Sequence, residues 1–168
     1  MKTEKIFFVL CIVLGSCLLN GCGPEKPEGL PTLYPLTLTV TQDGKPAADV
    51  MVSLRSTNPG MVWTVGGKTN SDGNTQLMTH GQYVGVPEGK YKVVLSKTEN
   101  EGYEEYIKAK DRYDDAAAAK IDVKFYSVID TEYNSPQTTP IEIEVTRKTK
   151  SLTIDGGPIV RIEQEFMR

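Results

Sequence analysis

Hydrophobic and polar residues alternate with a period of two along several short stretches of the chain. In residues 36–41, for example, leucine and valine alternate with threonine. This period is typical of a strand with one buried and one exposed face. Further predicted strands lie at 50–55, 61–65, 75–78, 91–96 and 141–146. Turn-forming Gly, Pro, Asn and Asp residues separate these stretches, so about seven short strands predict a mainly β, antiparallel β-sandwich.

The segment 99–120 breaks this pattern. It is rich in charged residues and alanine, and its apolar positions recur at helical spacing, namely Tyr103, Tyr106, Ile107, Tyr113 and Ala117. Residues 98–101, Thr-Glu-Asn-Glu, have the order of a capping box, although the glycine that follows weakens a helix start. We predict a helical insert here that lies against the sheet. Its tyrosines are expected to pack on the sheet rather than form a binding platform.

The last part of the chain returns to the strand pattern. Residues 121–128 predict a strand after the helical insert. Residues 152–154 and 160–166 flank the turn sequence Asp-Gly-Gly-Pro at 155–158. These two stretches therefore predict a closing hairpin.

The first 21 residues have the pattern of an export signal. Lys2 and Lys5 precede an uncharged apolar run of 14 residues, 6–19. This run fits the core of a signal peptide and is shorter than the roughly 20 residues that a membrane-spanning helix needs. Directly behind it, Leu-Asn-Gly-Cys at 19–22 resembles the lipobox of bacterial lipoproteins. The resemblance implies that Cys22 is acylated and becomes the first residue of the mature protein.

A second lipobox-like match ends at Cys17. Cleavage there would expose Leu18 and Leu19, whereas cleavage before Cys22 exposes a polar segment, so Cys22 is favoured. An ordinary secreted protein is the remaining alternative. The resemblance implies a diacylglycerol thioether and a palmitate-type acyl chain on Cys22, and several chains together anchor stably. We therefore expect lipid anchoring in the cell envelope. Glycine rather than aspartate at position 23 favours the outer membrane, on its periplasmic or surface face.

Beyond the signal peptide the sequence predicts a tether and one domain. Residues 22–34 form the tether, because 23–35 contain four prolines and two glycines and few apolar side chains. Residues 35–168 form the β-sandwich domain. The 147 residues that follow the signal peptide are the size of one ordinary domain.

Composition narrows the possible functions. The net charge of −3, with scattered lysines, lacks the concentrated basic face of a nucleic-acid-binding protein. All three cysteines lie at or before position 22, so the domain has no disulfide, thiol nucleophile or cysteine metal site. His80 is the single histidine and has no second ligand or triad partner near it in sequence. We therefore expect no catalytic residues, no cofactor, no metal and no enzyme activity.

Several acidic motifs have plainer explanations than a functional site. The Asp-Gly at 72–73 lacks the ligand spacing of a calcium loop and is expected in a hairpin turn. Two glutamates at 142 and 144 would lie about 7 Å apart on one strand face, as in a glycosidase pair, but an exposed sheet face explains them better. The remaining acidic cluster is expected to be solvated, and comprises Asp111, Asp114 and Asp115.

Trp63 is the candidate ligand-contact residue. It alternates with Met61 and Val65, which favours an inward-facing position on a strand. If Trp63 instead lies in a loop, it is a candidate anchor for a sugar or a peptide.

Three further motifs resemble the carboxypeptidase regulatory-like, or transthyretin-like, β-sandwich domains. They are Val-Thr-Gln-Asp-Gly-Lys-Pro-Ala-Ala-Asp-Val at 40–50, the glycine–threonine hairpin at 67–74 and Gly-Val-Pro-Glu-Gly-Lys-Tyr-Lys-Val at 85–93. The strand 138–145 is similar to strands of bacterial surface lipoproteins of this type. Asn70 departs from the aspartate usual in that hairpin. The resemblance implies the fold and very little of the activity, because this sandwich is a scaffold with many uses.

We therefore expect a non-enzymatic structural or interaction module of the cell envelope, whose protein or glycan partner the sequence does not identify. The alternative is a surface receptor module that binds carbohydrate or peptide through loop aromatics, with Trp63 as the contact.

Overall fold

The computed structural model describes residues 26–165. The predicted signal peptide and the lipidation residue Cys22 lie outside the described residues. Contacts divide the chain into two units, Met1–Leu30 and Pro31–Arg168. In the described part of the first unit, the Leu30 N–H donates to the Pro27 carbonyl at 3.2 Å and closes a turn.

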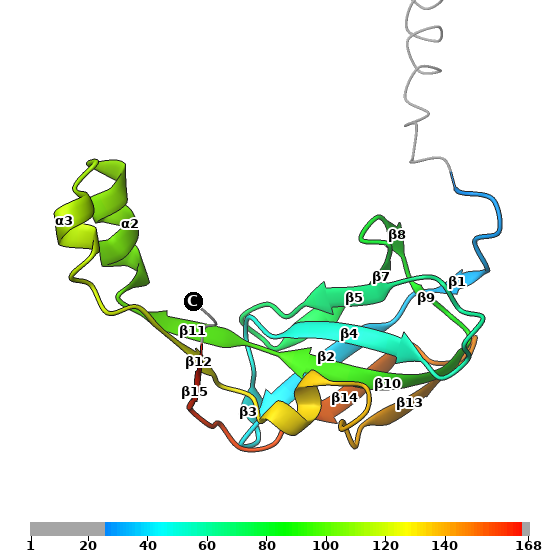
Figure 1. Ribbon diagram of the computed structural model, residues 1–168. Coiled ribbons are helices and arrows are strands. Elements are labelled where there is room, and N and C mark those ends of the chain that lie inside the picture. The colour runs from blue at the N-terminus through cyan, green and yellow to red at the C-terminus, as the bar shows by residue number, and fades with distance from the viewer. Residues whose placement is uncertain (1–25, 166–168) are drawn as a thin grey trace, which may run out of the picture. The chain divides into compact units, whose positions relative to one another are not determined.

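The larger sheet of the second unit has six strands in the order β13-β10-β4-β5-β7-β8 (Figure 1). All neighbouring strands in it are antiparallel. In chain order the strands are β4 (Met51–Ser56), β5 (Val65–Lys68), β7 (Met78–Thr79), β8 (Tyr83–Val84), β10 (Gly89–Ser96) and β13 (Glu142–Val145). The strands predicted around 50–55, 91–96 and 141–146 are confirmed.

The second sheet is built around one strand, β2 (Thr37–Gln42). Its other strands are β3 (Lys45–Pro46), β6 (Asn74–Gln76) and β14 (Ser151–Asp155). β3 and β6 pair with β2 in antiparallel register, whereas β14 pairs with it in parallel. The strand predicted at 36–41 is confirmed.

The predicted closing hairpin is wrong. β14 lies beside β2, while the last strand, β15 (Ile162–Gln164), pairs with a different sheet. The physical reason is burial, because Ile154 lies opposite Val40 and is only 4% exposed. The Gly156 N–H also donates to the Thr41 carbonyl at 2.8 Å and holds the end of β14 on β2. Local turn residues carry no information about this long-range partner.

The hydrophobic core lies between these two sheets, so the fold is a β-sandwich. Alternate residues of each strand face inward, as the period of two predicts. The largest fully buried side chain is Tyr91, whose hydroxyl donates to the Pro87 carbonyl at 2.8 Å. Burial raises the pKa of Tyr91 to about 12. The other core residues include Leu36, Leu38, Val40, Val50, Val52, Leu54, Val65, Leu77, Val93, Leu95, Ile129 and Val145.

Two short segments complete the sandwich. β1 (Leu33–Tyr34) pairs with β9 (Val86–Pro87), so residues assigned to the tether by sequence pair with the domain. Gly85, with φ of 112°, permits this approach, because a Cβ there would lie 2.9 Å from the Tyr34 carbonyl oxygen. The 3-10 helix η2 (Thr131–Asn134) follows the core residue Ile129.

The remaining elements form what we call the arm. It comprises β11 (Thr98–Glu101), α2 (Tyr103–Asp111), α3 (Asp115–Ala118), β12 (Lys124–Ser127) and β15. Its three strands form a sheet in the order β11-β12-β15. Figure 1 shows the two helices at the far end of β11 and β12, beyond the sheets of the sandwich.

The helical insert is confirmed, but two details of the prediction are wrong. Residues 98–101 are a strand and not a capping box. α2 begins at Tyr103, and its N-cap residue is Gly102, whose φ is 77° and which provides no side-chain cap. The helices do not lie against the sandwich. Their buried residues are alanines, Ala109 and Ala118, because so charged a segment has little apolar surface to place on a sheet.

Two turn glycines give a matched test of the packing. Gly44 and Gly73 both have φ of 72°, where an added Cβ costs about 1 kcal/mol or more. At Gly44 a Cβ meets nothing within 4 Å, but at Gly73 it lies 2.5 Å from the Val40 carbonyl oxygen. We expect Gly73→Ala to lower the free energy of unfolding by about 1 to 3 kcal/mol more than Gly44→Ala, measured by urea denaturation. Equal losses would show that the turn at Gly73 does not press on β2.

Candidate functional site

Trp63 lies in the loop that precedes β5, and not on a strand. β4 and β5 pair only as far as Leu54 and Val65, so residues 61–64 have no strand partner there. Trp63 is half-buried and lies outside the core cluster, whereas Val65 is 3% exposed. The predicted inward strand face is therefore wrong at Trp63, and the loop alternative holds.

The Trp63 side chain contacts His80. The two rings meet edge to face, with centroids 5.1 Å apart and planes at 84°. His80 lies in the turn between β7 and β8 with φ of 54°, and its N–H donates to the Thr64 carbonyl at 2.8 Å. No local sequence pattern indicates this pair, because the pairing of β5 with β7 brings together residues 17 positions apart.

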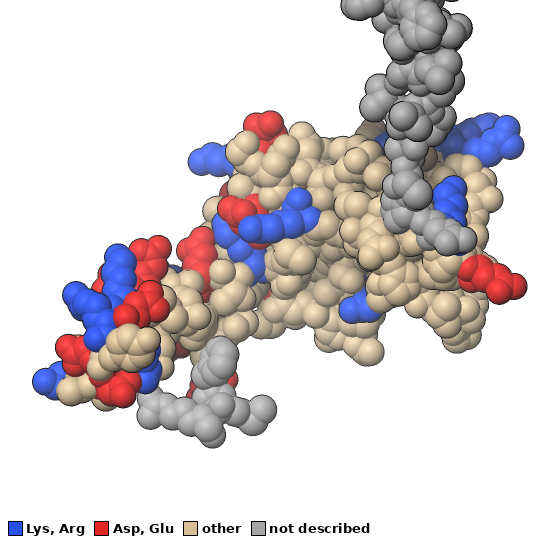
Figure 2. Space-filling view, turned by 90° about the horizontal axis from the view of Figure 1, so that it is seen from above, with Lys and Arg blue, Asp and Glu red and all other residues tan. Residues whose placement is uncertain are grey.

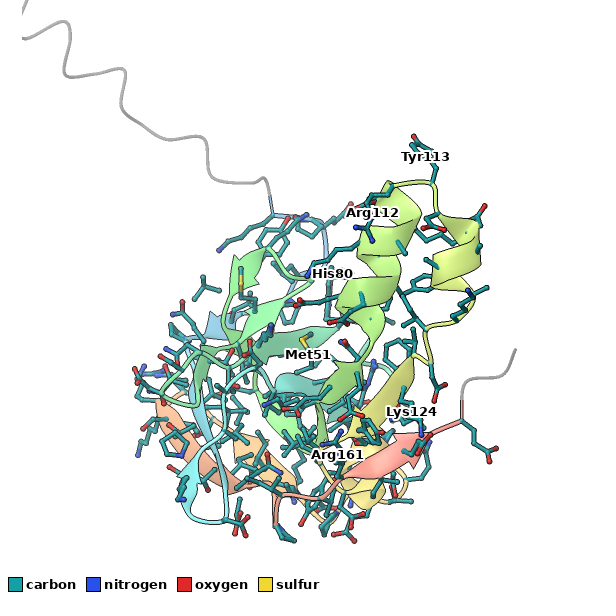
Figure 3. The ribbon with its side chains drawn as sticks, turned by 90° about the vertical axis from the view of Figure 1, so that its left-hand side faces the viewer. Met51, His80, Arg112, Tyr113, Lys124 and Arg161 are labelled. Carbon is teal, nitrogen blue, oxygen red and sulfur yellow. The ribbon has the colours of Figure 1, made fainter. Side chains whose placement is uncertain are left out.

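An apolar groove of about 400 Å³ lies next to this pair, over β4, β5 and β7. Two consecutive glycines of β5 contribute no side chains to it. A Cβ at Gly66 would lie 2.6 Å from the Val52 carbonyl oxygen, so β5 approaches β4 too closely for a larger residue. Met51, which is 51% exposed, lines the groove together with Ser53, Thr64, Met78 and Gly81. Figure 3 labels Met51 and His80.

This arrangement supports non-covalent contact. Within the described residues, the contacts of His80 are its ring contact with Trp63 and its backbone bond to Thr64, and neither involves a carboxylate. A half-exposed indole beside an apolar groove can stack on a sugar ring or hold an apolar side chain. The Trp63 pair and the groove are therefore one candidate contact surface.

The acidic motifs have structural partners. The Asn70 side chain accepts from the N–H groups of Asp72 and Asn74, which confirms a turn at 70–74. The turn does not close the predicted hairpin, because β5 pairs with β4 and β7 whereas β6 pairs with β2. Asp114 caps α3 by accepting from the Ala117 N–H at 2.9 Å. The pairs of the other carboxylates are Asp115 with Lys110 at 2.6 Å and Glu142 with Lys92 at 2.7 Å. The hydrogen bond from Lys92 lowers the pKa of Glu142, which lies on the exposed face of β13 with Glu144.

Neither a metal cluster nor a spanning helix is found in residues 26–165. No group of three or more His, Cys, Asp or Glu side chains in that range is placed to hold a metal ion. No helix in that range is long and apolar enough to cross a membrane.

A second, polar hollow of about 600 Å³ lies where the arm leaves the sandwich. It is open to solvent and is lined by Asp49 and Lys68 from the sandwich and by Lys97, Thr98, Glu99, Asn100 and Glu104 from the chain leading into the arm. Asp49 and Lys68 form an ion pair at 2.8 Å, and the hydrogen bond from Lys68 lowers the pKa of Asp49. No sequence pattern indicates this hollow, because its lining comes from segments that only the fold brings together.

The arm carries a network of paired charges. Arg161 on the segment before β15 forms an ion pair with Glu101 and lies over the Tyr126 ring, with the guanidinium carbon 4.1 Å from its centroid. The hydrogen bond from Arg161, supported by the one from Tyr126, lowers the pKa of Glu101. In Figure 2 both signs of charge gather over the helical end, whereas much of the visible sandwich surface carries neither.

The turn between the two helices exposes an aromatic residue at its tip. Tyr113 is 93% exposed and points away from the neighbouring elements (Figure 3). Its N–H donates to the Lys110 carbonyl and that of Asp114 to the Ala109 carbonyl, which together form a Schellman motif. Glycine is preferred at this position, yet Tyr113 adopts φ of 57° there. The strained backbone of Tyr113 costs stability, and its exposed side chain contributes no burial to offset that cost. The stability of the fold therefore does not explain a tyrosine at this position.

Comparisons of the chain with protein-family models, with curated proteins and with solved structures gave no match.

The contact between Trp63 and His80 can be measured by a double-mutant cycle. We expect Trp63→Ala and His80→Ala to be coupled by about 0.5 to 1.5 kcal/mol in the free energy of unfolding, the range of aromatic pairs. The matched control pairs Trp63→Ala with Gln82→Ala, an exposed residue of the same turn, and should give no coupling. Zero coupling with His80→Ala would contradict the edge contact.

Proposed function

We propose that this chain is a lipid-anchored protein of the cell envelope whose β-sandwich serves as a non-enzymatic interaction module. Support for the anchor comes from the sequence, where the lipobox-like 19–22 directly follows the apolar run. The described domain starts at Pro31, so a short segment would join it to an acylated Cys22. The position-23 glycine favours the outer membrane as its location.

The observation that carries the interaction role is the composition of the arm. Of the described residues between Leu95 and Ile129, none belongs to the hydrophobic core cluster. The sandwich therefore does not need these residues for its core, and they instead present charged side chains and Tyr113 to the surroundings. Surface aromatic residues are enriched among those that carry binding energy between proteins.

The β-sandwich is compatible with the carboxypeptidase regulatory-like resemblance of the turn motifs. Domains of that type serve as accessory scaffolds, which agrees with an interaction role. The mildly acidic net charge of −3 argues against a nucleic-acid partner.

A receptor for carbohydrate or peptide is the second candidate. It is favoured by the half-buried Trp63, by the exposed Val62 next to it (76% exposed), and by the adjoining apolar groove. In this alternative the ligand would contact the sandwich rather than the arm.

The anchor is tested by two cysteine substitutions. We expect Cys22→Ser to move the protein from the membrane fraction to the soluble fraction, because serine lacks the thiol that would carry the diacylglycerol and fewer than two acyl chains anchor weakly. Cys17→Ser is the matched control and should leave the protein in the membrane fraction. Mass spectrometry of the anchored form should detect no peptide that precedes Cys22. The reverse distribution of the two variants would assign the lipid to Cys17.

The two candidate contact surfaces are separated by site-specific crosslinking in intact cells. A photo-reactive amino acid in place of Tyr113 should give a discrete adduct with an envelope protein, whereas the same residue in place of Val62 should not. Both positions are well exposed, at 93% and 76%. Adducts from position 62 alone would overturn the arm as the contact surface and favour the receptor.

A further inference from the structure

The backbone of β11 has one edge without a strand partner. β11 is the terminal strand of the arm sheet, and none of the described strands pairs with it on the side opposite β12. The groups on that free edge follow from alternation along the ladder. The Lys97 carbonyl accepts from Val128 N–H, so residue 97, and by alternation 99 and 101, bond toward β12. Thr98 and Asn100 therefore direct their N–H and C=O groups to the free edge.

The free edge lies on the same side as β4. In β10, the Val93 N–H donates to Ile141 on the β13 side, while the Lys90 carbonyl accepts from Thr57 on the β4 side. The backbone N–H and C=O groups of even-numbered residues in β10 thus point toward β4. Because β11 continues β10 with the same alternation, those of Thr98 and Asn100 point in the same direction. The register Ser96 opposite Met51 would place Asp49 opposite Thr98 if β4 continued.

The chain before β4 turns away instead. Asp49 has φ of 61°, and its N–H donates to the Thr69 carbonyl at 3.0 Å. The buried Thr69 side chain also accepts from the Val50 N–H at 2.9 Å and donates to the Ala47 carbonyl at 2.6 Å. These bonds hold the segment away from β11, and the polar hollow of about 600 Å³ lies in the place of the missing strand.

We propose that the free edge of β11 binds an extended, basic peptide segment of another protein as an added strand. This inference rests on the proposed interaction role and names its chemistry. The four residues of β11 span about 13 Å and suit a short segment, with the backbone of Thr98 and Asn100 supplying the ladder bonds. The ion pair of Asp49 with Lys68 bounds the hollow at the sandwich end.

The charges around the hollow favour a basic segment. Its two lysines are already paired, Lys68 with Asp49 at 2.8 Å and Lys97 with Glu99 at 3.4 Å. Glu104 has a distant partner, Lys108 at 3.8 Å, and its side chain is 82% exposed. A lysine or arginine of the added strand would therefore meet an acidic residue that the hollow does not neutralise.

The same charges disfavour a second copy of this chain as the occupant. Two β11 edges paired with each other would bring Glu99 and Glu104 of one copy close to those of the other. Like charges on facing strands are destabilising, and charged side chains are a common protection of exposed edges. The segment therefore comes from a different protein.

The test measures binding of a fluorescent peptide in which lysine and valine alternate, by anisotropy with the full-length protein in detergent. Asn100→Pro removes the free-edge N–H but spares the bonds to β12, so the fold is retained. We expect it to weaken binding by about ten-fold or more, since one hydrogen bond and close strand approach are lost. Asn100→Ala changes the side chain alone and should bind like the unmodified protein. Circular dichroism and a urea melt check that both variants fold.

A second pair of variants tests the charge. Glu104→Lys should weaken binding of the lysine peptide by about five-fold, as expected for exposed ion pairs. Glu105→Lys makes the same charge change on the next residue of α2, which does not line the hollow, and should have a smaller effect. A peptide with glutamate in place of lysine should bind more weakly to the unmodified protein.

Three results would overturn the proposal: no binding of the lysine peptide, equal binding by Asn100→Pro, or a self-association that Asn100→Pro abolishes. The last would assign the edge to a second copy. A crosslinked envelope partner at position 113 that survives Asn100→Pro would leave the proposed interaction role standing and remove the β11 edge from it.

Discussion

The structure depends on the pairing of β10 along both of its edges. β13 lies on one side and β4 on the other, so the backbone polar groups of β10 can be satisfied while the strand lies at the centre of the sheet. Its alternate side chains, Tyr91, Val93 and Leu95, are all 0% exposed and contribute to the core shared with the second sheet. The positions of β4 and β13 therefore follow from β10. The positions of β5 and β7 follow in turn from β4.

The arm originates from the same strand. β10 ends at Ser96 and β11 begins at Thr98, so nearly continuous extended chain passes from the core into solvent. Its neighbour on one side changes from β13 to β12, whereas on the other side β4 ends and no strand among residues 26–165 replaces it. The turn at Asp49, fixed by the buried Thr69, therefore creates both the end of the sheet and the hollow beside β11.

The two candidate contact surfaces differ in their physical basis. Around Trp63, absence of side chains on the β5 glycines leaves an apolar groove beside an aromatic pair. At the arm, charged side chains surround a strand edge whose backbone N–H and C=O groups can form hydrogen bonds with a partner. An apolar groove suits burial of a small ligand, whereas a strand edge suits recognition of an extended backbone. This difference is why the interaction role and the receptor role predict different partners.

The sequence by itself determined the positions and inward faces of the central strands β2, β4 and β10. Around Val40, Val52 and Val93 the period of two predicted the strand and its buried side, because alternation is a local consequence of strand geometry. The turn at Asn70 was likewise predicted from its residues, although the strands that it joins lie in different sheets. The apolar run and lipobox-like segment that end at Cys22 support the anchor, which remains a prediction from sequence.

Only the tertiary structure decided which strands pair and what surrounds the candidate residues. The parallel pairing of β14 with β2 depends on burial of Ile154 next to Val40, residues 114 positions apart. Trp63 was misplaced for the same reason, since its strand-like alternation begins before Val65, where pairing with β4 starts. The sequence does not predict the free edge of β11, because that edge exists only where the chain before β4 turns away at Asp49. Alternation fixes which way a side chain points, but only long-range packing decides what it meets.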